Sequence, residues 1–545
     1  MTSVYSIFAV AVISIGLLFF GVFLTHSGKF TYFINCLIVI YFAYYLWLEN
    51  FGIFMRFDAI NSLNSLANIQ DDSLYFRYFI CFSTIILIIF FIGISDRFFI
   101  SKTSIYEFPI LVLFLFFGGL FALSLHTFID IFLGLEIVTL ASYVLITFER
   151  QNRFSTYAGI QYFILGSLPS ARLLIAFGLF YIQGGSVALQ DLDILFNTVI
   201  PNSELVQVDE LSYIFKNTGD TIIESGYEVN WHIFNTNGTY FDLNVVLEQI
   251  NPENALVLIS LFFMYFNFFF KLTAAPFHVW APSVYGKAPI ASVAFLSIYS
   301  KARIFFLIYK LINSVTHMFG FITFITFIII GIITIIIGIV GAFSEKRIKP
   351  FFIYSSIGHV GFILVGLSLG TIDGAIATFH YLLVYVLSSF VMWFILIILN
   401  RNTIKLNQLS TLKDMHPLLA IFFAFLIFSR SGIPPFGGFF IKLDILAAVI
   451  DSSHFFINYC LFICTIISFF YYLRLIKIMY FDTAEKIGSN VSMISLHNTY
   501  QTEYSIQNVY RLWIVSLIRI ILGFYIIIVQ KPRFRINAEA LSSLF

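Results

Sequence analysis

Residues 267–282 read NFFFKLTAAPFHVWAP, so a long apolar run ends on Lys271 and meets a proline five positions later. Proline at position 276 removes a backbone hydrogen bond and bends or ends a helix there. At membrane depth, the carbonyl groups that such a break frees are tolerated where they are buried in protein or line a hydrated cavity. The stretch therefore predicts a broken membrane helix with a lysine beside the break. The alternative is that Lys271 simply marks the end of a helix.

A second stretch of the same kind lies in the other half of the chain. Residues 431–438 read SGIPPFGG and interrupt the apolar segment 416–449, and Lys442 follows seven residues after Pro435. Interrupted helices at corresponding places in two halves of a sequence are typical of transporters built from internal repeats. The two breaks therefore favour a transporter with a repeated architecture.

The composition excludes an ordinary soluble protein. Of the 545 residues, 60% are hydrophobic and only 11% are charged, whereas soluble domains carry about 25% charged residues. The net charge of +1 provides no basic surface for nucleic acid. The four cysteines lie in or beside apolar stretches, so neither a disulfide framework nor an iron–sulfur site is expected. The 70 phenylalanines and 30 tyrosines fit an A+T-rich organellar gene.

Apolar runs of ~20 residues are long enough to cross a bilayer, and the chain holds enough of them for an all-α polytopic membrane protein with about 14 transmembrane helices. Most Lys and Arg residues of the connecting loops follow odd-numbered spans. This bias puts those loops on the cytoplasm-like side and both termini on the other. The predicted spans are residues 4–25, 31–49, 78–95, 108–126, 128–148, 157–182, 254–275, 290–312, 320–343, 351–370, 374–399, 416–449 (interrupted), 455–481 and 509–530.

One connection differs from the others in its charge. Residues 183–253 contain eleven acidic residues and a single basic one, Lys216. The segment is either a solvated excursion outside the membrane or a surface on which a partner subunit docks.

A few ionisable residues lie too deep in apolar spans to reach water. Lys301 has about eleven apolar residues on either side, or ~16 Å of helix, which its side chain cannot cross by snorkelling. Glu136 sits near the middle of 128–148. Such groups cost several kcal/mol unless a partner or internal water compensates, so a functional site is favoured over a structural ion pair. Asp130 is close to the helix end and is expected at the membrane interface.

Two histidines, His359 and His380, also fall in apolar spans. Histidine can pass a proton near neutral pH, but a lone membrane histidine serves about as often in a helix–helix hydrogen bond. The small residues around His359 favour it as a functional group. Gln161 and Arg172 are eleven positions apart and therefore share one helix face.

A mid-membrane carboxylate and a row of lysines together form a candidate proton relay. Changing the contact between a glutamate and a lysine switches the lysine between holding and releasing its proton. No phosphate-binding glycine loop, cysteine cluster or haem-type histidine pair accompanies these residues in the sequence. The chain is therefore expected to carry no redox centre.

Several short motifs resemble those of one family, in the same order over about residues 108–450. The chain is similar to the antiporter-like membrane subunits of respiratory complex I. Complex I has three antiporter-like chains. This chain resembles one of them most, because it has lysine at position 442 and no long lateral helix is expected after the fourteenth span. The motifs are Gly134-Leu135-Glu136, Phe270-Lys271-Leu272, Pro276-Phe277-His278-Val279-Trp280-Ala281-Pro282, Ser300-Lys301-Ala302, Ser356-Ile357-Gly358-His359-Val360-Gly361 and Ser431-Gly432-Ile433-Pro434-Pro435 with Lys442.

The resemblance implies two inverted five-helix repeats, residues 108–312 and 320–481, each with one broken helix. A three-helix segment, residues 1–107, would precede them, and a C-terminal helix and tail, residues 482–545, would follow.

The resemblance also implies roles for the buried charges. Glu136 would pair with Lys271, Lys301 would be the central relay residue, and Lys442 would end the relay. His359 is a further candidate for this path.

As a complex I subunit, the chain would be a proton-translocating part of NADH:ubiquinone reductase in the mitochondrial inner membrane, with both termini on the intermembrane-space side. It would carry no cofactor, because NADH, FMN, iron–sulfur clusters and ubiquinone would bind to partner subunits. Expected partners are the other membrane-arm subunits, including a neighbouring antiporter-like chain, membrane lipids, and accessory subunits against residues 183–253. The alternatives are a subunit of a cation/proton antiporter without NADH oxidation, and a structural scaffold, which would not need four buried charges.

Two positions depart from the family's pattern. Gln161 stands where bacterial relatives often carry lysine, so a neighbouring relay contact is lost or is taken over by Arg172. Ser283 stands directly after Pro282, where the family usually has aspartate.

Overall fold

A computed structural model describes residues 107–124, 127–189, 255–312, 320–398, 406–415, 417–452 and 454–482. These ranges contain helices and no strand; one isolated bridge joins Thr127 to Ala188. The all-α fold is confirmed for this part of the chain. The predicted spans 4–25, 31–49, 78–95 and 509–530, and most of the acidic connection, lie outside the described residues.

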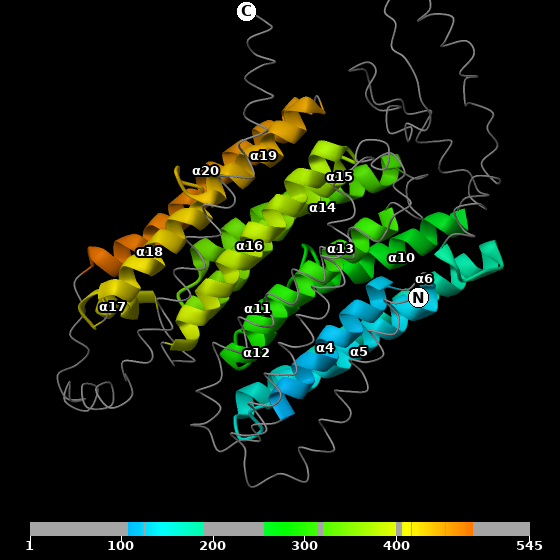
Figure 1. Ribbon diagram of the computed structural model, residues 1–545, viewed down its shortest axis with the longest axis horizontal. Helices are drawn as coiled ribbons and strands as arrows, with labels where there is room; N and C mark the ends of the chain where they lie inside the picture. Colours follow the sequence, from blue (N-terminus) through cyan, green and yellow to red (C-terminus); the bar gives the residue numbers. More distant parts are fainter. Residues whose placement is uncertain are drawn as a thin grey trace, which may run out of the picture.

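The first half of the described chain contains three long helices, then a broken helix, then a helix with a distorted centre (Figure 1). The distortion is a π-helical turn, Leu296–Ser300, which lies between α12 and α13. The helices are α4 (Glu107–Ser124), α5 (Phe128–Ile146), α6 (Arg153–Gly184), α10 (Ala255–Leu272), α11 (Trp280–Tyr285), α12 (Ile290–Phe295) and α13 (Lys301–Leu311).

The second half follows the same general order of long helices and one broken helix. A 3-10 turn, Leu406–Leu409, leads into the short helix α17 before the broken helix begins. The helices are α14 (Gly320–Ser344), α15 (Ile348–Ser368), α16 (Ile372–Ile398), α17 (Ser410–Met415), α18 (Pro417–Ser431), α19 (Gly437–Asp451) and α20 (Phe455–Tyr480).

Each predicted span that falls in the described residues corresponds to a helix or a broken helix. Among those residues, seven helices are long and apolar enough to cross a membrane. α6 is longer than the predicted span 157–182 at both ends. α4 ends at Ser124 and α5 begins at Phe128, which confirms the predicted division near position 126.

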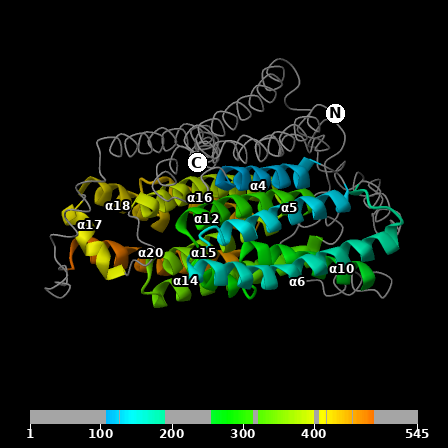
Figure 2. The same cartoon turned by 90° about the horizontal axis from the view of Figure 1, so that it is seen from below.

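The helices lie side by side in a slab, with α4–α6 at one edge and α18–α20 at the other (Figure 1). In the turned view, α4, α16 and α18 lie on one side of the slab and α6, α14 and α20 on the other (Figure 2). Small residues let some helices come very close, as is typical of membrane bundles. A Cβ on Gly338 of α14 would lie 2.5 Å from the backbone nitrogen of Gly358 on α15. Likewise, a Cβ on Gly118 of α4 would lie 2.9 Å from the carbonyl oxygen of Gly134 on α5.

Both predicted helix breaks are present. α10 ends at Leu272, where Thr273 adopts a φ of 61°, and the Ala275 amide donates to Thr334 Oγ1 on α14 at 2.9 Å. The Trp280 indole donates to the Phe270 carbonyl at 3.2 Å. These bonds satisfy backbone groups that the break releases, as burial at membrane depth requires. The second break separates α18 from α19, and Gly432 adopts a φ of 87°.

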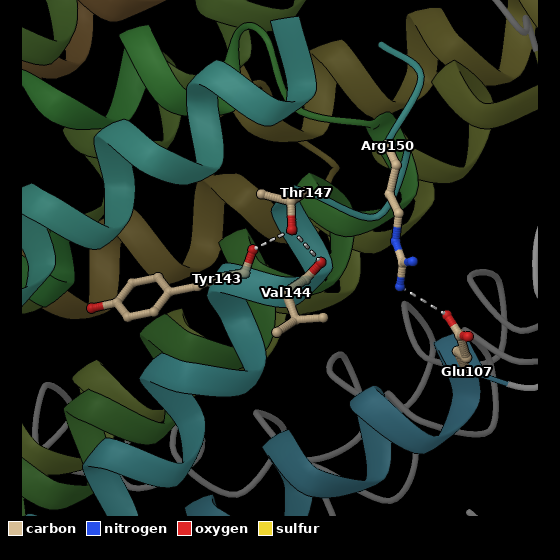
Figure 3. A network of polar contacts seen from close by, with 5 residues as sticks. All are labelled: Glu107, Tyr143, Val144, Thr147 and Arg150. Atoms are coloured by element: carbon tan, nitrogen blue, oxygen red, sulfur yellow. Dashed lines mark hydrogen bonds and ion pairs between the residues drawn. The ribbon is translucent and has the colours of Figure 1, made fainter. Parts of the chain in front are cut away.

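Polar contacts surround the end of α5 and the connection that follows it (Figure 3). Thr147 Oγ1 donates to the carbonyls of Tyr143 at 3.2 Å and Val144 at 3.1 Å. Arg150, in the connection to α6, lies 3.8 Å from the Glu107 carboxylate at the start of α4. The Thr147 bonds close the last turn of α5, and the Arg150–Glu107 pair links the connection after α5 to the start of α4.

Candidate proton-relay site

Lys301 occupies the centre of the described bundle. It follows the π-helical turn directly, and its side chain is 2% exposed. Its Nζ donates to Ser356 Oγ on α15 at 2.8 Å. Single π-turns inside helices occur frequently at functional sites, because they re-aim the side chains beside them. The predicted burial of Lys301 is confirmed, and a neutral hydroxyl is the partner that holds it.

Glu136 and Lys271 come from α5 and from the end of α10. Lys271 acts electrostatically on Glu136 and on Arg303, although no hydrogen bond joins it to either within the described residues. Glu136 Oε2 accepts a bond from Thr139 Oγ1 at 3.1 Å, one helical turn further along α5. The carboxylate is thus held by a bond within its own helix, within electrostatic range of Lys271. Their pairing in a relay stays a prediction.

His359 is buried among hydroxyl groups from two other helices. Its Nδ1 lies 2.7 Å from the Tyr381 hydroxyl on α16, and its Nε2 lies 3.0 Å from the Tyr472 hydroxyl on α20. The Tyr472 hydroxyl is in turn hydrogen-bonded to Ser355. Both ring nitrogens therefore have partners. His359 also lies one helical turn from Ser356, the residue that holds Lys301.

Lys442 lies beside the second break. The side chain is 6% exposed, and its Nζ donates to the Ser431 carbonyl at 2.9 Å and to Ser468 Oγ on α20 at 3.3 Å. The carbonyl of Ser431 is one of those freed where α18 ends. The break thus provides the acceptor for the lysine that the sequence predicted beside it.

Two buried arginines were missed by the sequence analysis. Arg303 lies on α13, is 2% exposed, and acts electrostatically on Lys271. Arg430 lies near the end of α18, is 3% exposed, and acts on Lys301 and His359. Lys301 was singled out because it is an ionisable residue deep in an apolar run. Both arginines meet the same criterion, so it could have identified them as well.

The two positions that depart from the family pattern are in contact. Gln161 Nε2 on α6 donates to Ser283 Oγ on α11 at 3.1 Å. The guanidinium of Arg172 lies 4.1 Å from the centre of the Phe266 ring. His380 Nδ1 on α16 lies 3.5 Å from a carboxylate oxygen of Asp444 on α19.

The described residues contain no group of three or more His, Cys, Asp or Glu side chains that could hold a metal ion. The described interior does bring together carboxylate, amine, imidazole and hydroxyl groups. Groups of these kinds can take up and pass on protons.

Comparison with known proteins gives consistent matches. A family model described as "NADH:quinone oxidoreductase/Mrp antiporter, TM" matches residues 126–216 and 228–468. The NADH-quinone oxidoreductase subunit N of Paramagnetospirillum magneticum is 28% identical over 410 residues, covering 73% of this chain and 74% of the relative. The NADH-ubiquinone oxidoreductase chain 2 of Oenothera berteroana is 30% identical over 384 residues, covering 70% and 68%.

A solved structure shares the fold. A chain of respiratory complex I from Thermus thermophilus superposes with a TM-score of 0.62 at 21% identity, covering 88% of this chain and 90% of that one. At this level of identity the likeness concerns the fold alone.

Proposed function

Because the chain belongs to the family of membrane subunits that NADH:quinone oxidoreductases share with Mrp antiporters, we propose that it is the chain 2 (subunit N) member of respiratory complex I. In this role it translocates protons across the membrane. Electron transfer from NADH to ubiquinone, in other subunits, drives the translocation. The relatives of the same name support this assignment over about two thirds to three quarters of their length.

The observation that carries the proposal is the burial of Lys301. A lysine held by a serine hydroxyl at the centre of a membrane bundle has a large energetic cost and no structural need. A proton-relay role explains the cost, since an amine in that place can take up and release a proton without leaving the bundle.

The proposed path follows the buried groups across the described bundle. Glu136 and Lys271 receive the proton, Lys301 passes it on, and Lys442 delivers it at the far end. His359 lies between the last two, and its contacts with Tyr381 and Tyr472 support a place for it in the path.

The two inverted repeats, residues 108–312 and 320–481, belong to the same proposal. The order of long helices with one broken helix in each half supports them. Residues 183–253 form an extramembrane insertion of the first repeat, and residues 1–107 and 482–545 flank the pair.

The partners and location follow from the assignment. The chain sits in the mitochondrial inner membrane with both termini in the intermembrane space, among lipids and other membrane-arm subunits that include a neighbouring antiporter-like chain. Accessory subunits cover the acidic residues 183–253. NADH, FMN, iron–sulfur clusters and ubiquinone are bound by partner subunits, so this chain serves an enzyme without carrying its redox chemistry.

A substitution at Lys301 tests the proposal. In inner-membrane vesicles, we expect the Lys301→Ala complex to assemble and to lose most of its proton pumping. The matched control is Lys310→Ala, which removes a buried lysine from the same helix, where its Nζ donates to the Leu123 carbonyl at 3.0 Å. Normal pumping by an assembled Lys301→Ala complex would favour a structural scaffold instead.

Migration on native gels distinguishes a complex I subunit from the other alternative, a subunit of a cation/proton antiporter. Co-migration of the chain with a large NADH-oxidising assembly supports complex I. A small particle with sodium-dependent transport and no NADH oxidation would identify a stand-alone cation/proton antiporter.

A further inference from the structure

A bridge of hydroxyl groups joins Lys301 to Arg430. Lys301 Nζ donates to Ser356 Oγ at 2.8 Å, and Arg430 Nη2 donates to Ser389 Oγ at 2.8 Å. The hydroxyl of Tyr385 on α16 interacts with both serines. The bridge runs from α13 through α15 and α16 to α18, and it connects the central lysine to the helix that ends at the second break.

Arg430 brings a permanent charge into this bridge. It is 3% exposed, its Nη1 lies 2.8 Å from Met392 Sδ, and its guanidinium lies 5.7 Å from the centre of the Tyr385 ring. In the described part of the chain no carboxylate forms an ion pair with it. A guanidinium stays protonated in proteins, so this charge does not come and go with the relay proton.

We infer that Arg430 is a positioning residue whose fixed positive charge keeps Lys301 ready to give up its proton, an inference that rests on the proposed function. A lone buried lysine that forms a good hydrogen bond can retain its proton and stop the relay. A nearby fixed cation repels the protonated form and leaves the neutral form unaffected. The hydroxyl bridge holds the two cationic groups at a fixed separation and keeps them from approaching each other directly.

Other charged and polar groups lie near Lys301 or near Lys271. From α15, His359 lies within electrostatic range of Lys301, and from α16 the polar group facing it is Tyr385. On its own helix, Arg303 acts on Lys271 at the other end of the path. Lys271 on α10 and Glu136 on α5 act on each other. Arg430 on α18 is therefore the permanent charge that acts on Lys301 from another helix.

The test is the pH profile of proton pumping by the assembled complex in inner-membrane vesicles. Arg430→Gln removes the charge and keeps an amide that can bond Ser389. We expect the profile of Arg430→Gln to move to higher pH by about one unit, with a several-fold slower rate at neutral pH. Arg430→Lys keeps a positive charge and should keep the profile of the unaltered complex. A merely structural arginine would change the amount of complex without moving the profile.

Controls keep the inference separate from the proposed function. Lys310→Met removes another buried cation about 14 Å along the helix from Lys301 and should leave the profile in place. Arg430→Met serves as the second neutral variant if Arg430→Gln assembles poorly. An unmoved profile in an assembled neutral variant, or the same shift in Arg430→Lys, overturns the inference. If Lys301→Ala abolishes pumping, the proposed function stands even when the inference about Arg430 fails.

Discussion

Gln161 on α6 and Ser283 on α11, 122 residues apart in sequence, are hydrogen-bonded to each other at 3.1 Å. Ser283 Oγ also donates to the Trp280 carbonyl at 2.8 Å, so the pair ties α6 to the short helix that follows the first break. Both partners are neutral, so this contact between the two helices involves no charged group.

Introducing opposite charges at positions 161 and 283 should be tolerated only in combination. Gln161→Lys or Ser283→Asp alone places an unpaired charge in a half-buried site, and each should reduce the amount of assembled complex several-fold. The double variant should recover most of it, because the two charges then compensate each other. Native gels and NADH oxidation rates measure the recovery. Additive losses in the double variant would show that the two side chains do not act as a pair.

Gly432 should not tolerate a side chain. Its φ of 87° is unfavourable for any residue with a Cβ, at a cost of about 1–3 kcal/mol. A Cβ there would also lie 3.1 Å from Lys442 Cδ and 3.3 Å from its Nζ. We expect Gly432→Ala to lower the thermal stability of the complex and to reduce proton pumping more than NADH oxidation.

The matched control is Gly178→Ala on α6, where no atom lies within 4 Å of the added carbon. Alanine in a helix interior is favoured over glycine by about 0.5–1 kcal/mol, so this variant should keep both activity and stability. Equal behaviour of the two alanine variants would contradict the role given to the second break.

Glu136→Gln should remove the negative charge of this side chain, in the first half of the proposed path, without disturbing the fold around it. The amide oxygen can still accept the bond from Thr139 Oγ1, so the fold should be preserved. Lys271 and Arg303 are then left as two cations without the carboxylate that acts on Lys271. We expect proton pumping, measured with a pH-sensitive dye in vesicles, to fall at least several-fold while assembly stays normal.

Asp130→Asn is the control for Glu136→Gln. The Asp130 carboxylate lies in the first turn of α5, where it accepts a hydrogen bond from Thr127 Oγ1 at 2.5 Å. Like Glu136, it is therefore bonded to a threonine of its own region. Its loss should affect stability slightly and pumping hardly at all. A comparable loss of pumping in both variants would point to a general effect of negative charge on α5.

The sequence predicted the local features of this molecule well. Proline and glycine residues fix where a helix must break, and the breaks after α10 and α18 lie where Pro276 and Gly432 indicated. Burial of Lys301 followed from its distance to the ends of an apolar run, and Lys442 lies beside the second break as its sequence position indicated. Helix breaks and the depth of a residue in an apolar run depend on residues nearby in the sequence, so they can be predicted from the sequence.

Long-range contacts could not be predicted in the same way. The bond between Gln161 and Ser283, and the bridge from Lys301 to Arg430, depend on how four or more helices pack against one another. The π-helical turn before Lys301 has no distinctive residue pattern, since its five residues also suit an α-helix. The contacts between the proposed relay residues therefore depend on tertiary packing.

The close contact between Gly338 and Gly358 restricts how α15 can move against α14. The backbones of α14 and α15 meet there with no side chain between them. Ser356 and His359 flank this point, so the helix that carries them has little freedom to slide along its neighbour. Register shifts of helices take microseconds to milliseconds, whereas side-chain rotations are much faster. In the proposed relay, proton transfer at Ser356 and His359 would therefore depend on side-chain rotation and not on sliding of the helix.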